Sequence, residues 1–427
     1  MKMNRRTFLS TIGLFPFLSF ERALGHKIKK DSNKIVDLNP HLSYNILSRK
    51  GNKMSDGYLV PGLPDGMGAF AVKNKTVIIR NHELTKWTHS RESAFSNPKK
   101  EIQALDNKHY DVKSFGGTTT MVYDNASNKV VNEYLSLSGT IANCGGGITP
   151  WGTWLSCEEH IEKKQNNQTP HGYVFEVSPL GDSLEIPRPL KKMGRFNHEA
   201  VAFDKFNQAY LTEDRNDGLI YKFIPERINS LKKGELFALR IDDNTFTDFR
   251  NWSKSLVTKN KRFNIEWIKI EEHDPIEDSV RFEGHYKGAT KFARGEGITS
   301  DGVSIYIACT NGGPVKKGQI WKITPTSKNE STIELWYEVD IENNINMPDN
   351  IMIAPWGDLI VCEDNSDINR LWGINPNGQS YLIAENNYNG AEFAGVCFSP
   401  IDGSMFVNLQ QNGLTISVTG NWKEVLI

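Results

Sequence analysis

The chain has 427 residues, of which 50 are basic and 51 acidic, so its formal net charge is −1. A balanced charge provides no field that attracts nucleic acid or an anionic membrane, and binding driven by net charge is therefore excluded. The 35 glycines and 10 tryptophans are typical of many tight turns between aromatic-rich strands.

The first 25 residues have the pattern of an export signal. Paired arginines at Arg5 and Arg6 precede a hydrophobic stretch over 11–20, which is too short to span a membrane. Small residues before and at Gly25 predict cleavage after this position. A signal of this twin-arginine type is recognised by the twin-arginine export machinery. We therefore expect a mature protein of residues 26–427, with no membrane span, in the periplasm or secreted.

A repeated strand signature organises the rest of the chain. Glycine, an aliphatic residue, an aromatic residue and a closing proline recur over 172–179, 218–225 and 318–325, and in degenerate form over 369–376. The copies begin 46, 100 and 51 residues apart, which indicates a unit of about 45–50 residues. Short strands with this period predict a β-propeller.

Six segments match the expected innermost strand of a propeller unit. They begin near residues 66, 145, 199, 296, 349 and 392. They predict an all-β fold, a six-bladed β-propeller that forms a single domain over residues 26–427. Residues 85–115 and 226–290 break the period and are predicted to be two rim insertions, the second of which could overhang the mouth of the channel.

Polar and acidic motifs follow four of the predicted strands at equivalent places. These motifs are Asn81-His82-Glu83, Cys157-Glu158-Glu159, Glu213-Asp214 and Cys362-Glu363-Asp364. At the entry of the innermost strands, the residues expected to point into the channel are Glu199, Glu296, Asp349 and Glu392. So many carboxylates raise each other's pKa unless cations neutralise them. The pattern therefore predicts a site for several metal ions, with Asn197 or His198 as a ligand or a supporting residue.

The residue types limit which metals fit this site. Carboxylates with few histidines favour hard cations, and Ca²⁺ is the leading candidate. The five cysteines are an odd number for an exported protein, so at least one is not in a disulfide. Cys157 directly precedes two glutamates and is the predicted thiolate ligand. A thiolate requires a transition metal such as iron or zinc, so a mixed site is expected.

Arg294 is predicted to bind an anion. It stands two residues before Glu296, and on an extended strand both side chains lie on the same face. Its forked donors fit a phosphate at the mouth of an acidic channel. The alternative is that Arg294 only neutralises Glu296.

In combination and order, these motifs resemble those of the PhoX family of alkaline phosphatases. The matching segments are 81–83, 157–159, 194–199, 212–214, 294–296, 348–350, 362–364 and 392–395. The resemblance implies a twin-arginine-exported, six-bladed propeller that hydrolyses small-molecule phosphomonoesters by metal-assisted chemistry. It also implies a cofactor of two iron ions and three calcium ions joined through a bridging oxo group, with Cys157 on iron and Arg294 on the phosphate.

The resemblance extends the set of expected site residues. The expected metal ligands are Cys157, Glu158, Glu159, Glu199, Glu213, Asp214, Glu296, Asp349, Asn350, Glu363, Asp364 and Glu392. The expected supporting residues are Asn81, His82, Glu83, Asn197 and His198.

Two other functions fit the same scaffold. A Ca²⁺-dependent lactonase or aryl esterase needs one calcium ion and few ligands, so the predicted thiolate and the many carboxylates argue against it. A non-enzymatic exported propeller would use the acids to hold structural Ca²⁺ while it binds a protein or a glycan, and a propeller fold alone does not separate binding from catalysis. Iron in the purified protein excludes the first function, and a loss of turnover on changing Arg294 excludes the second.

Overall fold

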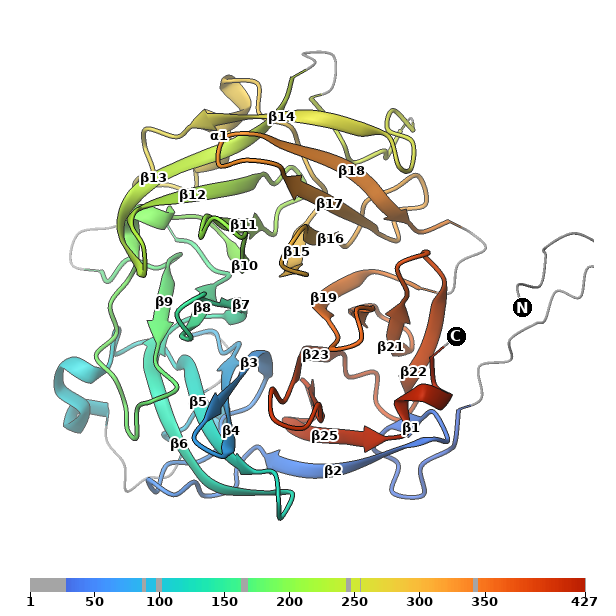
Figure 1. Ribbon diagram of the computed structural model, residues 1–427. Helices are drawn as coiled ribbons and strands as arrows, with labels where there is room; N and C mark the ends of the chain where they lie inside the picture. Colours follow the sequence, from blue (N-terminus) through green and yellow to red (C-terminus); the bar gives the residue numbers. More distant parts are fainter. Residues whose placement is uncertain are drawn as a thin grey trace, which may run out of the picture.

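Antiparallel strands arranged around a central axis are the main regular elements of the described structure (Figure 1). The structure is a computed structural model that describes residues 28–86, 90–96, 102–162, 168–242, 247–253, 255–340 and 345–426. The predicted signal peptide over 1–25 lies outside the described residues. The prediction of an all-β, propeller-like fold is confirmed.

The described strands form five sheets. One sheet holds β3 (Pro64–Val72), β4 (Lys75–His82), β5 (Gly116–Asp124) and β6 (Lys129–Thr140), and the next holds β7 (Asn143–Ile148), β8 (Trp154–Glu158) and β9 (Val174–Val177). A nine-stranded sheet holds β10 (His198–Phe203), β11 (Ala209–Glu213), β12 (Ile220–Arg227), β13 (Ser230–Ile241), β14 (Arg262–Lys269), β18 (Ser331–Glu338), β17 (Gln319–Pro325), β16 (Ile305–Cys309) and β15 (Gly295–Ser300). The fourth sheet holds β19 (Pro348–Ile353), β20 (Leu359–Glu363), β21 (Asn369–Ile374), β22 (Ser380–Asn386) and β1 (Asp37–Leu38). The fifth holds β23 (Phe393–Phe398), β24 (Met405–Leu409), β25 (Leu414–Gly420) and β2 (Leu42–Arg49).

The nine-stranded sheet differs from the separate blades that the sequence predicts. Strand β14 pairs with β13 on one side and with β18 on the other. It therefore joins two four-stranded meanders, β10–β13 and β15–β18, into one sheet. Both β13 and β14 come from the segment 226–290, which was expected at the rim, and this segment also carries α1 (Val280–Tyr286).

Six strands line the axis of the ring. Strands β3, β7, β10, β15, β19 and β23 contact one another in this order, and β23 returns to β3 (Figure 1). They are the six segments predicted to be innermost. Glycines allow the close approach, because a side chain at Gly297 would collide with the Asp349 carbonyl of the next strand, and one at Gly145 would collide with Glu199. Side chains at the strand entries are thereby brought together.

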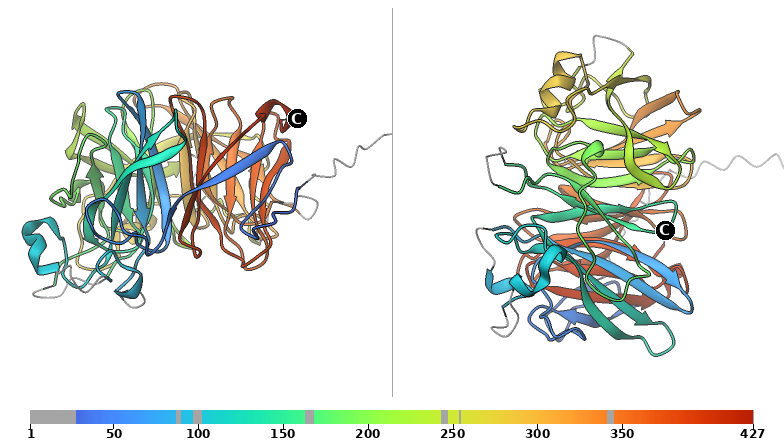
Figure 2. Two further views of the ribbon diagram at one scale, coloured as in Figure 1. Left: turned by 90° about the horizontal axis from the view of Figure 1, so that it is seen from below. Right: turned by 90° about the vertical axis from the view of Figure 1, so that its left-hand side faces the viewer.

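The beginning of the chain closes the ring. Strand β2 pairs with β25 from Leu42 opposite Gly420 to Arg49 opposite Leu414. The remaining short helices in the described part are η1 (Ser90–Glu92), η2 (Ile102–Lys108), η3 (Lys191–Met193) and η4 (Trp422–Glu424). The side view in Figure 2 places η2 and α1 on the same face of the disc. No helix within the described ranges is both long enough and apolar enough to cross a membrane.

Apolar side chains fill the space between neighbouring sheets. Trp321 and Trp372 are almost fully buried, and the Trp321 ring stacks on Phe249 with centroids 4.9 Å apart. Burying a large apolar side chain contributes about 2–3 kcal/mol. This packing fixes the sheets against one another and gives the axial side chains a rigid support.

Candidate metal centre

A β-bulge near the start of each innermost strand turns side chains toward the axis. In β7 the pairing register shifts between Asn143 and Gly146, and in β10 it shifts in the same way between His198 and Val201. In five of the strands, the first residue inside the bulge is Asp65, Cys144, Glu199, Glu296 or Asp349. Bulges re-aim side chains, so a shared irregularity brings these five residues to one place. In β23 the first residue inside the bulge is Gly395, and Glu392 supplies a carboxylate from just before that strand.

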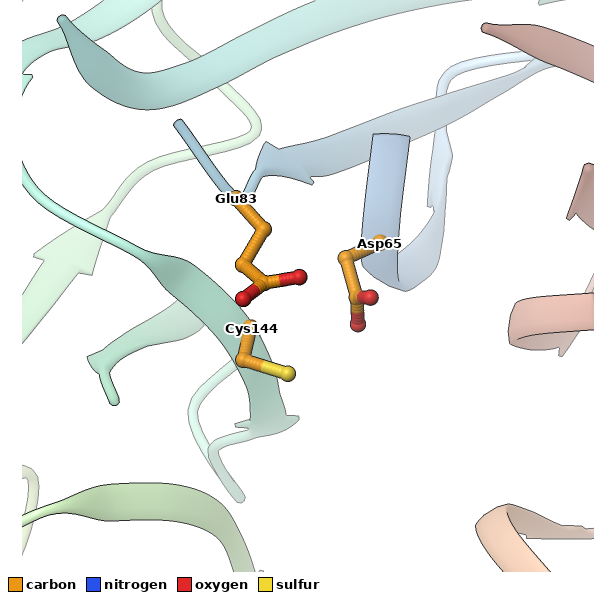
Figure 3. Close-up of side chains that lie close together, drawn as sticks. All are labelled: Asp65, Glu83 and Cys144. Atoms are coloured by element: carbon orange, nitrogen blue, oxygen red, sulfur yellow. The ribbon is translucent and has the colours of Figure 1, made fainter. Parts of the chain in front are cut away.

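Eight carboxylates and one thiol form four overlapping groups among the described residues, and in each group the potential ligand atoms lie within 4.8 Å of one another. The groups are Asp65, Glu83 and Cys144; Cys144, Glu159 and Glu199; Glu199, Glu296 and Asp349; and Asp349, Asp364 and Glu392. Cys144, Glu199 and Asp349 each belong to two groups, so the four groups form one continuous axial cluster. Figure 3 shows the first group, in which the Cys144 thiol from β7 lies close to the carboxylates of Asp65 and Glu83.

Buried oxygens without partners indicate that cations belong in the axial cluster. Both carboxylate oxygens of Glu199 and Oδ1 of Asp349 are buried without a hydrogen-bond partner among the described residues. Burial, followed by the neighbouring carboxylates, raises the pKa of Glu199 and of Glu296 well above the usual range. Such groups are costly to bury unless they are paired or bind a metal. Carboxylates with one thiol therefore fit the mixed calcium and iron site that the sequence predicts.

Two consecutive polar residues lie at the end of each of four strands, and the two members of each pair have different surroundings. In three strands the second residue belongs to the axial cluster; these residues are Glu83, Glu159 and Asp364. In the fourth strand the second residue is Asp214, which contacts Arg294 beside the cluster. The first residues, His82, Glu158, Glu213 and Glu363, are fully buried and bond to protein groups. In each pair it is therefore the second residue that lies in or beside the axial cluster.

The structure does not bring Glu158, Glu213 or Glu363 into the axial cluster. Glu158 accepts hydrogen bonds from the amides of Gly172 (2.8 Å) and Tyr173 (3.1 Å). Glu213 accepts one from the Tyr221 hydroxyl at 3.0 Å, and Glu363 accepts one from the Trp372 indole at 2.8 Å. These three carboxylates hold the loops and strands behind the site.

The thiol in the axial cluster is Cys144, whereas the sequence prediction was Cys157. Cys157 is fully buried and packs in a hydrophobic cluster with Leu155, Val174 and Leu211. Cys157 lies on β8 opposite Val174 of β9, and it belongs to none of the four ligand groups of the described residues. Cys144 therefore replaces Cys157 as the candidate thiolate ligand.

Several other predicted residues support the centre without belonging to it. Asn197 donates to Glu159 Oε1 at 3.1 Å, and Asn81 donates to the carbonyls of Cys144 (2.8 Å) and Gly145 (2.6 Å). The predicted ligand Asn350 instead accepts a hydrogen bond from the Gly395 amide at 2.7 Å and so links β19 to β23.

His82 and His198 are held away from the axial cluster. Their ring nitrogens lie 2.8 Å and 3.0 Å from the carbonyls of Gly62 and Gly194, respectively. Burial lowers the pKa of both imidazoles, which are therefore neutral near pH 7. Neither ring is placed to bind a metal in the axial cluster.

Sequence reasoning missed Asp65, Cys144 and Gln410. A signal existed for the first two, because each directly precedes a glycine at an innermost strand, as Glu296 precedes Gly297. Gln410 donates to Asp65 Oδ2 at 2.6 Å and to Glu83 Oε2 at 3.0 Å. It sits just after β24, at the place that Glu83 occupies after β4, and no feature of the sequence marks an amide there as functional.

Arg294 lies at the edge of the axial cluster and contacts two acids. Its Nε and Nη2 donate to Asp214 at 2.8 Å and 3.0 Å, and Nη2 also donates to Glu296 at 2.6 Å. These carboxylates raise the pKa of Arg294 despite its partial burial, so the guanidinium stays charged. Its Nη1 has no hydrogen-bond partner in the described part of the chain, and its side chain is 25% exposed. One edge of the fork therefore remains able to bind an anion while the other holds the acids.

A cavity of about 540 Å³ follows the axis beside the cluster. The inner strands line it, and Glu199 and Asn350 reach it from the side of the metal centre. The axial cluster thus stands at one end of this cavity, and Arg294 is not part of the cavity lining.

A propeller-like ring with a buried carboxylate and thiol cluster at its axis, and an arginine beside it, defines a metal-dependent enzyme for an anionic substrate. The sequence matches the family "Alkaline phosphatase PhoX" over residues 24–413. The chain therefore belongs to the PhoX family of alkaline phosphatases, and it is a phosphomonoester hydrolase.

One solved structure shows the same fold, and two others are less similar. Pseudomonas fluorescens PhoX, determined with the transition-state analogue vanadate, is 17% identical, with a TM-score of 0.67 over 91% of this chain and 96% of that chain. A virginiamycin B lyase from Staphylococcus aureus is 13% identical, with a TM-score of 0.42 over 88% and 99% of the two chains. A Xanthomonas campestris gluconolactonase is 8% identical, with a TM-score of 0.41 over 90% and 98%. A search of curated protein sequences gave no significant match.

Removing the metals is expected to invert the pH dependence of stability. In the metal-free folded state, burial is the main cause that raises the pKa of Glu83 from 4.5 to about 8 and that of Asp65 from 3.8 to about 6. The folded state then holds these protons more tightly than the unfolded chain. The stabilisation of the folded state that comes from binding these protons is complete below about pH 4, and it is lost as the pH rises through about 6 to 8.

Thermal unfolding of chelator-treated and untreated protein from about pH 5 to 9 checks this prediction. The chelated protein should have a lower Tm at the alkaline end. The untreated protein should instead lose stability toward acid, because protons compete with metals for the same ligands. Parallel curves for the two samples would show that these carboxylates bind no stabilising cation.

Proposed function

We propose that this phosphomonoester hydrolase works with two iron and three calcium ions held by the axial cluster. The observation that carries the proposal is the continuous chain of four ligand groups, two of which share the Cys144 thiol. A soft thiolate suits iron, so Asp65, Glu83, Cys144, Glu159 and Glu199 would hold the iron ions. The two groups built from carboxylates alone, around Asp349, would hold two of the three calcium ions.

The substrate phosphate would lie between the axial cluster and Arg294. When bound, the metal ions supply positive charge that draws in the phosphate oxygens and activates a water molecule for attack. Asp214 orients the guanidinium through two hydrogen bonds, which leaves Nη1 to donate to a phosphate oxygen. Charge on the equatorial oxygens is stabilised by this preformed donor as the alcohol leaves. No serine or threonine nucleophile is required.

The backbone at Arg294 supports this positioning role. Its φ of 48° lies in the left-handed region, which non-glycine residues rarely adopt. The Arg294 amide donates to the Arg215 carbonyl at 2.9 Å, and the Arg294 carbonyl accepts from the Thr310 amide at 3.1 Å. An unusual conformation that is held at both peptide groups fixes the direction in which the side chain leaves the strand.

We also infer a six-bladed architecture and export. The closed ring of six innermost strands supports six blades, with β14 joining the third and fourth blades at their outer edges. The twin-arginine pattern at Arg5 and Arg6 supports export to the periplasm or beyond, with loading of the metals into a folded chain. N-terminal sequencing of the exported protein tests the cleavage site, and a mature chain that still begins at Met1 would contradict it.

Elemental analysis of protein purified without chelator, together with p-nitrophenyl phosphate hydrolysis at alkaline pH, tests the proposed centre. We expect iron and calcium in a ratio of about two to three, and turnover that is lost after chelation. Calcium without iron, in a protein with no turnover, would contradict both the metal assignment and the proposed mechanism.

A further inference from the structure

A second pocket lies at the rim of the mouth next to Arg294. It has a volume of about 310 Å³, and its lining includes Asp248, Arg250, Trp252 and Lys316. None of these residues belongs to the axial cluster. The pocket therefore needs its own explanation.

Short hydrogen-bonded links place this rim pocket beside the phosphate-binding arginine. Trp252 donates to the Asn311 carbonyl at 2.6 Å, and Arg250 donates to the Asn216 carbonyl at 3.0 Å. Asn216 and Asn311 are themselves joined by a 2.8 Å hydrogen bond. These turns directly follow Arg215 and Thr310, whose backbone groups hold the backbone of Arg294. The rim pocket and Arg294 thus share the same two turns.

The two cations of the rim pocket differ in whether their charge is compensated. Arg250 forms hydrogen bonds of 2.9 Å and 2.6 Å to Asp248, so its charge is neutralised. Lys316 is exposed, and no carboxylate of the described residues lies within ion-pair distance of it. Its ammonium lies 4.9 Å from the centre of the Trp252 ring, which attracts a cation without neutralising it. Among the described residues that line the pocket, Lys316 is therefore the cation whose charge is not compensated.

We propose that the rim pocket binds an anionic group on the leaving alcohol of the substrate, with Lys316 as the specificity-determining residue. The inference rests on the proposed function, because it assumes that the scissile phosphate lies at Arg294. A phosphomonoester whose alcohol carries a carboxylate several carbons away can then contact both sites at once. The anionic end interacts with the Lys316 ammonium, while Trp252 forms the wall beside it.

A matched pair of open-chain substrates tests the proposal. 6-Phosphogluconate carries a carboxylate at the far end of the chain, and sorbitol 6-phosphate carries a hydroxymethyl group there. We expect the metal-loaded protein to favour 6-phosphogluconate in kcat/KM. Lys316→Gln should lower this preference roughly 3- to 10-fold, and Lys316→Glu should lower it further, with kcat/KM for sorbitol 6-phosphate nearly unchanged. The preference should also decrease with added salt, because the pair is exposed.

Lys317→Gln is the matched control, since Lys317 is the adjacent exposed lysine and does not line the pocket. It should leave the preference within about twofold of the unmodified protein. The proposal would be overturned if the ratio of kcat/KM for the two substrates were the same in the unmodified protein and in both Lys316 variants. The phosphatase mechanism would remain intact. Failure of the unmodified protein to hydrolyse either substrate would instead contradict the proposed function on which the inference rests.

Discussion

A Cys144→Ser variant is expected to lose its iron and to decrease in turnover by a factor on the order of 10³. Cys144 belongs to two of the four ligand groups, so its removal affects two metal positions at once. A serine hydroxyl is a hard and weakly acidic donor that does not replace a thiolate on iron. Iron and calcium per chain, measured with the initial rate of p-nitrophenyl phosphate hydrolysis, check the prediction.

Cys157→Ser is the matched control for this substitution. Cys157 lies in an apolar cluster, where a hydroxyl has no evident partner, and the variant should lose about 1–3 kcal/mol of unfolding free energy. Its metal content and turnover should remain close to those of the unmodified protein. If Cys157→Ser loses iron while Cys144→Ser keeps it, the thiol assignment from the structure is wrong.

The two cysteines illustrate what the sequence could and could not predict about the site. The sequence context favours Cys157, because two glutamates follow it directly. The direction of a side chain at a strand end depends on the phase of the strand and on the bulge of the strand that pairs with it. The register shift after Asn143, which turns Cys144 toward the axis, arises from pairing with β8, and the glycine that follows Cys144 is its one local mark in the sequence.

The same limit explains the division of the acidic pairs. The repeat places Glu158-Glu159 and Glu363-Asp364 at equivalent points, which is why a convergent metal site could be predicted. It does not tell which residue of each pair faces the axis. Glu158 and Glu363 instead accept hydrogen bonds from a backbone amide and an indole, respectively, behind the site.

The fold was predictable where local patterns repeat. The glycine, aromatic and proline signature and the six strand entries identify the propeller-like ring and its innermost strands. The sheet that joins two meanders was not predictable, because β14 is set by pairing with both β13 and the distant β18. Such long-range pairing depends on how the ring closes rather than on the sequence of 226–290.

An Arg294→Ala variant is expected to keep its metals and to lose turnover by about 10²- to 10³-fold, the usual effect of removing one preformed donor to a transition state. Product phosphate should also inhibit the variant more weakly, because Nη1 no longer donates to it. Arg294→Lys should recover only part of the activity, since an ammonium keeps the charge but lacks the fork that engages Asp214 at two points.

Arg215→Ala provides the comparison that separates substrate binding from simple charge balance near the mouth. Arg215 lies one residue beyond Asp214 on the same turn, and its guanidinium pairs with Asp278 rather than with the axial cluster. We expect this variant to keep most of its turnover and its sensitivity to phosphate.

Arg294 also neutralises Glu296 and Asp214, so loss of metal is the competing explanation for the effect of Arg294→Ala. Unchanged iron and calcium in Arg294→Ala, together with weaker phosphate inhibition, would assign the effect to the substrate, whereas loss of metal with unchanged phosphate inhibition would reduce Arg294 to a counter-ion of the acids.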